Sequence, residues 1–315
     1  MSADNRPPVP VPAATVILVR EEAGRLQVYL LRRSQTSGFM PGSYVFPGGL
    51  VDDRDRDDAL WLAHADLAPD VLGERLGQAA GGFEALCYGV AAVRETFEEA
   101  GVLLARPGLT AKGDFGRACE RRLAESPAHG WFTQLVVSDG WVLTLSALSR
   151  WARWVTPERM PRRFDTRFFV AVLPPGQACL PDMRETTAGI WISPRDALVE
   201  NTNGNMPLSP PTLATLHEFL RTPTLQRLQT VLSGRNWGEP IMPRLVPLAK
   251  DRQFVLLMPW DPMYGRNENE IRLGDVESLV LPAAEPFSRV WHCNGLFRPI
   301  RCESKERLNL GFAIT

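Results

Sequence analysis

The chain has 315 residues, of which 23% are charged and 44% belong to the hydrophobic set, and its formal net charge is -1 at pH 7. This balance excludes a protein that binds nucleic acid through an overall basic surface, so any nucleotide must be recognised by local groups. No apolar run approaches the roughly 18 residues that a membrane span needs. The five cysteines are scattered, without a C-x-x-C pair, which is typical of reduced thiols. We therefore expect a cytoplasmic protein with neither a membrane nor a nucleic-acid partner.

The N-terminal part predicts a tail followed by a β-hairpin. Residues 1–12 contain four prolines, and we expect them to form a flexible, extended tail. Two apolar, β-branched runs follow at 14–19 and 26–31, and the polar segment between them predicts a hairpin. The second run leads into Arg33 and Ser34, whose guanidinium fork and hydroxyl suit a phosphate group. The alternative is that these side chains are simply solvated at the end of a strand.

A turn and an acidic, helical segment come next. Residues 42–46 have a strand-like pattern and end in the turn Pro47-Gly48-Gly49. Residues 60–76 have an amphipathic helical pattern. They are preceded by the acidic cluster Asp52, Asp53, Asp55, Asp57 and Asp58. The cluster lacks the spacing and the distant glutamate of a calcium loop, so we expect a solvated turn and a helix start.

Three carboxylates gather in the segment Arg94-Glu95-Thr96-Phe97-Glu98-Glu99-Ala100-Gly101-Val102, which follows an apolar run over 83–93. On a helix, Glu95 lies beside both Glu98 and Glu99, and Arg94 reaches Glu98. These like charges repel one another, and the helix macrodipole disfavours anions at the C-terminal end, so we expect a cation to offset the cost. Carboxylate oxygens favour Mg²⁺ or Mn²⁺ over Zn²⁺. The alternative is a solvated acidic face of a helix.

Residues 94–102 and the turn over 46–49 together resemble the signature of the Nudix hydrolase family. The second half of that signature matches except at Thr96, which stands where an apolar residue is usual. In the first half, the position of the signature glutamate falls on Asp55 when counted from Gly49 and on Leu86 when counted back from Arg94. That glutamate is therefore lost or displaced, and its role is open. Residues 56–93 then stand where the signature has seven residues. Such an insertion resembles the type 19 subgroup of the family.

This resemblance covers about residues 13–220 and implies an α/β/α sandwich around a mixed sheet. It also implies a catalytic site with Arg94, in which Glu95, Glu98 and Glu99 bind Mg²⁺ or Mn²⁺. The segment that contains Arg33 and the turn is similar to the extra motif of coenzyme A pyrophosphatases, although the histidine of that motif is missing. The resemblance therefore implies a set of substrate-binding residues: Arg33, Ser34, Phe46, Pro47, Gly48 and Gly49.

The region after the signature predicts a short strand, a helical segment and two further strands. The short strand covers 102–104, and the helical segment covers about 111–153. That segment contains three irregularly spaced tryptophans, which we expect in the core or at an interface rather than against a base: Trp131, Trp141 and Trp151. Residues 154–157 and 164–173 follow as strands, the second of them long and apolar enough for the middle of a sheet.

A second candidate for catalysis lies between two of these elements. Residues 182–198 resemble the late Nudix passage in which a strand precedes a capped helix, and Ser193 before Pro194 is a suitable N-cap. Some members of the family have a glutamate near here that acts as a general base, which makes Glu185 a candidate. A surface salt bridge is the alternative. A further helix is predicted from about 209 to 220.

The composition changes after residue 234, and we expect a Nudix domain over 13–235, with a helical insertion over about 56–82, and a β-rich extension over 236–315. Short strands are predicted at 243–247, 254–258 and 278–281. The extension has no assigned role. It contains His292, Cys293 and Cys302, which lack the number and spacing of a zinc site. The insertion is a candidate for a lid or for the contact in a homodimer.

The resemblance implies a metal-dependent hydrolase that cleaves the diphosphate linkage of a nucleoside diphosphate derivative. The partial motif and the insertion favour coenzyme A or an acyl-coenzyme A as the small-molecule substrate. Two alternatives remain. One is an ADP-ribose or dinucleotide pyrophosphatase, and the other is a non-catalytic Nudix-like protein that binds a ligand and regulates.

Overall fold

A computed structural model of the chain describes residues 6–38, 40–77, 82–109, 113–124, 130–248, 253–267, 270–271, 274 and 276–301. The first five residues of the predicted tail, the Gly81 end of the insertion and Cys302 lie outside the described residues. Within the described part, no helix is long and apolar enough to cross a bilayer.

A mixed seven-stranded sheet forms the centre of the molecule. Five of its strands follow the order β3-β2-β1-β8-β7, while β4 pairs with β1 and β9 pairs with β2. The predicted hairpin is confirmed, and the second strand of the pair continues to Arg33. β1 runs parallel to β8, while β2 and β7 run antiparallel to their neighbours. The strands are β1 (Val11–Glu22), β2 (Arg25–Arg33), β3 (Tyr44–Val45), β4 (Gly48–Leu50), β7 (Ser149–Val155), β8 (Phe164–Val172) and β9 (Thr186–Ile192).

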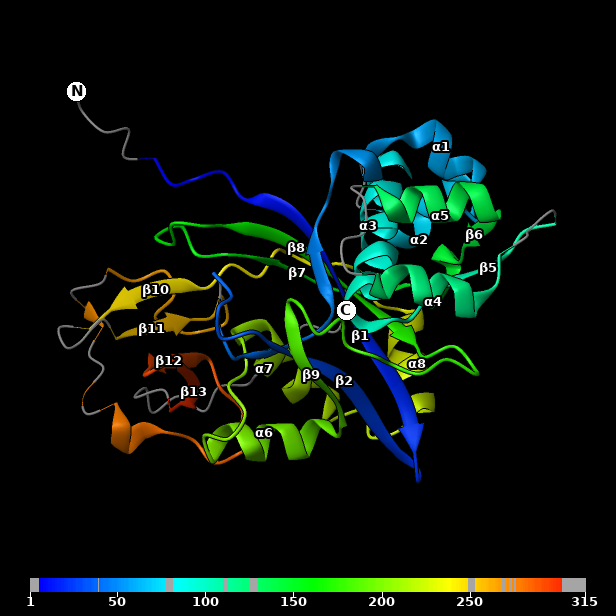
Figure 1. Cartoon of the computed structure of the whole chain (residues 1–315). Helices are drawn as coiled ribbons and strands as arrows, with labels where there is room; N and C mark the ends of the chain where they lie inside the picture. The colour runs from blue at the N-terminus through cyan, green and yellow to red at the C-terminus, as the bar shows by residue number, and fades with distance from the viewer. Residues whose placement is uncertain are drawn as a thin grey trace.

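One face of the sheet is covered by a helical lobe, which appears beside the labels α1 to α5 in Figure 1. Its longest helix, α3, packs on β1 and extends from Gly82 to Ala100. The shorter elements are η1 (Asp53–Arg56), α1 (Asp58–Ala63), α2 (Pro69–Leu76), β5 (Ala105–Pro107), α4 (Phe115–Leu123), α5 (Trp131–Asp139), β6 (Trp141–Leu143) and η2 (Leu145–Ala147). The predicted helical insertion is therefore two helices, because Pro69 begins a new one.

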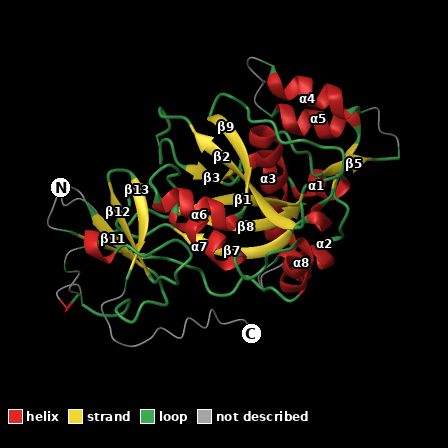
Figure 2. Cartoon of the chain, turned by 90° about the horizontal axis from the view of Figure 1, so that it is seen from below, coloured by secondary structure: helices red, strands yellow, loops and turns green. Residues whose placement is uncertain are grey.

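The opposite face carries three helices, and a second, four-stranded antiparallel sheet lies on the side of α6 and α7. The helices are α6 (Pro194–Thr202), α7 (Pro210–Phe219) and α8 (Leu225–Ser233), and the elements beyond them are β10 (Arg244–Pro247), β11 (Phe254–Leu257), η4 (Glu277–Leu279), β12 (Arg289–Cys293) and β13 (Leu296–Ile300). In both views this second sheet lies at the opposite end of the molecule from α4 and α5 (Figure 1 and Figure 2). The α/β/α sandwich and the β-rich extension are confirmed.

The side chains of the central strands point alternately to the two faces of the sheet, so the core has two parts. In β1, Val16 and Leu18 join the cluster under α3, while Ile17 and Val19 join the cluster under α7. Successive side chains of a strand point to opposite faces, so a strand that is apolar throughout must be covered on both sides. Residues 16–19 of β1 form such a run, and this explains why the sheet needs helices on both faces.

Several predicted elements differ from the structure. Residues 102–104 form no strand, because Leu103 is hydrogen-bonded at both its amide and its carbonyl to the side chain of Gln177. The helical segment ends at Gly140 with φ at +71°, and 141–155 contain strands instead. Of the predicted strand 278–281, Ser278 and Leu279 lie in the 3-10 helix η4 and Val280 forms only an isolated bridge to Ile300. The strands β12 and β13 were not predicted. β1 begins at Val11, inside the predicted tail.

Candidate active site

The acidic segment lies in the last two turns of α3, whose apolar residues make it the central helix of the lobe. Thirteen of its residues are buried, so its register against the sheet is fixed by packing. Thr96, the departure from the signature, is fully buried and donates its hydroxyl to the carbonyl of Ala92 at 2.7 Å. Gly101 follows with φ at +72°, which ends the helix. Glu95, Glu98 and Glu99 therefore lie near the C-terminal end of a rigid helix.

The turn after β3 packs directly against these carboxylates. The amide of Gly48 donates to Glu99 Oε2 at 2.8 Å. A Cβ atom on Gly49 would lie 2.5 Å from the carboxylate of Glu95, and one on Gly48 would lie 2.4 Å from a backbone carbonyl of β1. Only glycine allows such close approaches. The two glycines of the turn thus let the sheet and the acidic helix meet.

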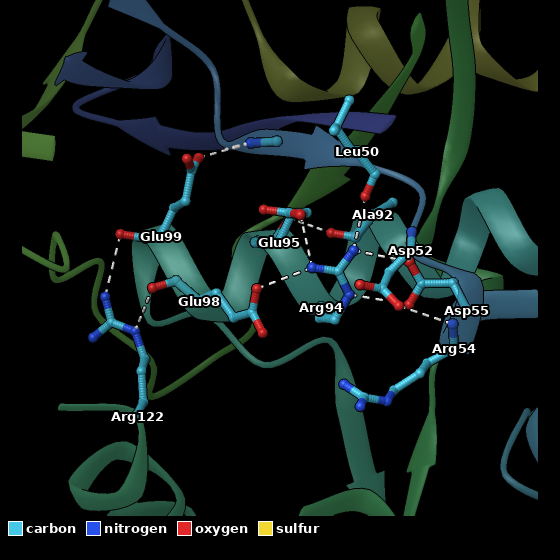
Figure 3. A network of polar contacts seen from close by, with 12 residues as sticks. Leu50, Asp52, Arg54, Asp55, Ala92, Arg94, Glu95, Glu98, Glu99 and Arg122 are labelled. Carbon is cyan, nitrogen blue, oxygen red and sulfur yellow. Dashed lines mark hydrogen bonds and ion pairs between the residues drawn. The ribbon is translucent and has the colours of Figure 1, made fainter. Parts of the chain in front are cut away.

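Arg94 is the centre of the network in Figure 3. Its guanidinium donates to both oxygens of Asp55, at 3.0 and 2.8 Å, while Nη1 donates to Glu95 at 2.7 Å and to Glu98 at 3.0 Å. Nη2 also donates to the carbonyl of Leu50 at 2.8 Å. Paired, forked contacts of this kind fix orientation strongly. Arg94 therefore holds two of the three carboxylates in place.

Asp55 corrects one expectation from the sequence. It is 1% exposed, not part of a solvated turn, because the 3-10 helix η1 turns it inward to accept from Arg94 and from the amide of Asp52. Asp55 stands where the signature glutamate falls when counted from Gly49. The long insertion after it therefore leaves its contact with Arg94 intact across 39 residues of chain.

Burial changes the acidity of the cluster. It raises the pKa of Glu95 to about 7, although Arg94 acts in the opposite direction. Burial also raises the pKa of Glu98, and it raises that of Glu99 further, with the Glu95 carboxylate adding to the effect. A bound cation lowers the cost of ionising such buried carboxyl groups. This oxygen donor set fits Mg²⁺ or Mn²⁺.

As they stand, the carboxylates do not yet form a coordination sphere. Among the described residues, no group of three or more acidic, histidine or cysteine side chains is arranged to hold a metal ion. Arg94 draws Glu95 and Glu98 to itself, whereas Glu99 is held by Gly48. Binding a metal ion would require these side chains to turn toward a common centre.

A cavity of about 360 Å³ opens over the carboxylates. The three glutamates form its floor, and the loop that contains Glu185 forms one wall. The start of α5, from Gly130 to Thr133, forms another wall. Its size is at the lower end of what ligand pockets usually have, about 300 to 1,000 Å³.

The comparisons with known proteins agree with this geometry. The sequence model of the NUDT19 Nudix domain matches residues 74–219. The chain is also 32% identical over 305 residues to the acyl-coenzyme A diphosphatase NUDT19 of Gallus gallus, an alignment that covers 80% of this chain and 79% of that protein. The chain belongs to the Nudix hydrolase family, in its NUDT19 subgroup. The prediction of the family and of its type 19 subgroup is confirmed.

Two further relatives support this assignment. The human protein of the same name is 31% identical over 277 residues, which covers 76% of this chain and 72% of that one. Among solved structures, a Nudix hydrolase from Alicyclobacillus acidocaldarius is 28% identical with a TM-score of 0.57 and covers 73% of this chain and 99% of that one.

In this Nudix hydrolase, Glu185 lines the same cavity as the three glutamates. Asp182 shapes its loop, because its side chain accepts hydrogen bonds from the amides of Arg184, Glu185 and Thr186. The carbonyl of Glu185 accepts from the amide of Ser34 at 2.9 Å. The role of Glu185 as a base stays a prediction.

The predicted substrate-binding residues do not line the cavity. Arg33 donates to Ser37, and the hydroxyl of Ser34 bonds to that of Thr36. Phe46 is 3% exposed and lies in the core under α7, and Pro47 accepts a hydrogen bond from the amide of Val16. Gly48 and Gly49 touch the carboxylates, as described above. Direct substrate contact by this set stays a prediction.

The sequence did not point to two groups of the site. Trp141 and Trp151 are buried, as expected, but Trp131 is only partly buried and lines the cavity. Its position as the first residue of α5, after Gly130, was the available signal. Arg122 was also missed, since nothing distinguishes it from other arginines in an amphipathic helix.

Proposed function

We propose that this Nudix pyrophosphohydrolase cleaves the diphosphate linkage of coenzyme A or an acyl-coenzyme A with the help of Mg²⁺ or Mn²⁺. The observation that carries the proposal is the cluster of three carboxylates on the floor of a cavity, Glu95 and Glu98 bonded to Arg94 and Glu99 bonded to Gly48. The relatives that cover most of the chain are named acyl-coenzyme A diphosphatases, and this supports the substrate class.

The proposed mechanism assigns a role to each of these side chains. A divalent cation bound by Glu95, Glu98 and Glu99 would neutralise charge on the diphosphate and lower the pKa of the attacking water. Arg94 orients two of these carboxylates before the substrate arrives. Glu185 accepts a proton from the water as it attacks one phosphorus. The other phosphate then leaves with the group attached to it.

The contact between Asp55 and Arg94 argues against a non-catalytic regulator. That alternative depended on the displaced glutamate of the signature. Asp55 occupies the position and binds Arg94 through both carboxylate oxygens. Asp55, although shorter than glutamate, can therefore hold Arg94 in place as the glutamate of the signature would.

Analysis of the products tests the proposal. Purified protein is incubated with Mg²⁺ or Mn²⁺ and with coenzyme A, acetyl-coenzyme A, ADP-ribose, NADH or a diadenosine polyphosphate. We expect adenosine 3',5'-bisphosphate from the coenzyme A compounds, and Glu98→Gln should lower kcat on the order of 10²-fold. Glu239→Gln changes an exposed glutamate outside the cavity and should leave kcat unchanged.

Two outcomes would overturn parts of the proposal. If ADP-ribose or NADH is cleaved and the coenzyme A compounds are not, the substrate class is wrong and the mechanism remains. If none of these compounds is cleaved with either metal, the proposed activity is wrong and the alternative of a non-catalytic ligand-binding protein is favoured.

A further inference from the structure

We propose that Arg122 is a positioning residue that fixes the loop of Glu185 to the end of the catalytic helix; this inference rests on the proposed function. Arg122 lies on α4, outside the signature, and is 3% exposed. Its Nε donates to the carbonyl of Glu98 at 3.1 Å, and Nη2 donates to that of Glu99 at 3.2 Å (Figure 3). Nη2 also donates to the carbonyl of Leu180 at 2.5 Å.

The three acceptors belong to two different parts of the site. Glu98 and Glu99 are in the last turn of α3, where carbonyls lack partners within the helix. Leu180 precedes the loop that contains Glu185. All three bonds go to main-chain carbonyls, so the guanidinium is not neutralised by them, and burial lowers its pKa. A buried cation is costly, and a position at a helix C-terminus offsets part of that cost.

Main-chain hydrogen bonds continue the connection toward Glu185. The amide of Leu180 donates to Ala100 at 2.8 Å, and the amide of Asp182 donates to Glu99 at 3.1 Å. The side chain of Asp182 then accepts from the amide of Glu185. These hydrogen bonds link the end of α3, through Asp182, to the backbone of the predicted base. Arg122 adds bonds to the same helix end and to Leu180, just before Asp182.

Gly101 is fitted to this arrangement. A Cβ atom at that position would lie 3.2 Å from Arg122 Nη1 and 3.3 Å from the Leu180 carbonyl. The positive φ of Gly101 already favours glycine. The absence of a side chain also leaves room for the guanidinium between the helix end and the loop. Through Arg122, the helix α4 would therefore help to position the predicted base.

The effect of Arg122 should be on kcat, because misplacing a proton acceptor by about 1 Å can cost on the order of 10²-fold in rate. We expect Arg122→Met to lower kcat by about 10- to 100-fold. KM should stay within about threefold, since the residues that bind the substrate are kept. Arg122→Lys keeps the charge and can reach one or two of the carbonyls, so it should recover part of kcat. Arg121→Gln changes the neighbouring arginine, which is 41% exposed, and serves as the control.

Hydrogen exchange gives a measurement that does not depend on activity. Amides 180–186 should exchange faster in Arg122→Met than in the wild type or in Arg121→Gln, while β10 to β13 keep their protection. Equal exchange over 180–186 in Arg122→Met and the wild type would overturn the proposal, even if no substrate were found. A variant that loses only thermal stability and keeps kcat and KM would make Arg122 merely structural. Failure of the wild type to cleave any compound would instead refute the proposed function.

Discussion

The two faces of the central sheet differ in the polar side chains that they bury. Under α3, charged groups are buried: Asp55, Glu99, Arg122 and Arg167 are each no more than 7% exposed. On α7 itself, the buried polar groups are the hydroxyls of Thr212 and Thr215 and the imidazole of His217, among apolar neighbours. The buried charges on this side, Asp261 and Arg289, lie in the extension and neutralise each other in an ion pair. Buried charge costs stability unless it is compensated. The α3 face therefore serves the chemistry, and the α7 face supplies stability.

The strongest test of this comparison is to remove a large side chain from the α7 face. Phe219 is 1% exposed, and its ring lies 4.6 Å from that of Trp151 in an edge-on contact. Phe219→Ala should lower the free energy of unfolding by about 3 to 5 kcal/mol. The folded fraction should keep its kcat. Denaturant titration measures the first effect, and initial rates at low temperature measure the second.

A phenylalanine on α3 is the matched control. Phe83 is 54% exposed, so Phe83→Ala should change the free energy of unfolding by no more than about 0.5 kcal/mol. If the folded fraction of Phe219→Ala has a clearly lower kcat than the wild type, the two faces are coupled and the division of roles is wrong.

The parts of the site that the sequence predicted are those set by local spacing. Glu95, Glu98 and Glu99 share a face because they are three and four residues apart, and this needs no tertiary information. The hairpin of β1 and β2 was predicted for the same reason. Asp55 shows the limit of such inference. Its position followed from counting along the chain, but its burial depends on Arg94, which is 39 residues away.

Other features could not be predicted, because they are contacts between distant segments. Arg122 bonds to carbonyls 24, 23 and 58 residues away, and no local pattern encodes a main-chain acceptor. Trp131 was predicted in the core or at an interface from its aromatic character alone. Its partial exposure results from the way α5 approaches α3, with its ring 5.8 Å from that of Phe97.

Trp131 provides the second test, this time on the α3 face. Because its partly buried ring lines the cavity, Trp131→Leu should raise KM by about tenfold, which corresponds to ~1.4 kcal/mol, and leave kcat within about twofold. Steady-state kinetics on the substrate that the wild type cleaves gives both values. Val137→Ala, at a 43% exposed position of the same helix, should change neither. An unchanged KM together with a lower melting temperature would mean that Trp131 only packs against its neighbours and does not contact the substrate.

The smallest predicted effect concerns protonation, for which the two faces respond with opposite signs. Burial raises the pKa of Glu95 and Glu99, so in the metal-free protein their protonation favours the folded state as the pH falls. Burial lowers the pKa of His217 from its ordinary 6.5, and nearby Arg221 acts in the same direction. Hydrogen bonds to the carbonyls of Ala284 and Glu285 and the Glu285 carboxylate oppose this shift.

Below pH 6.5 the unfolded chain therefore binds a proton at His217 more readily than the folded chain does, so its contribution to stability falls with pH. Above pH 6.5 both states are neutral there and the contribution is constant. We expect His217→Gln, whose amide can still donate to Ala284, to lose less stability than the wild type between pH 7.5 and 5.5, by about 1 kcal/mol. The difference between the two proteins cancels the opposite contribution of the carboxylates, which both retain. Denaturant titrations at the two pH values measure it, and identical losses would mean that His217 takes up its proton without disturbing the packing of α7 against the extension.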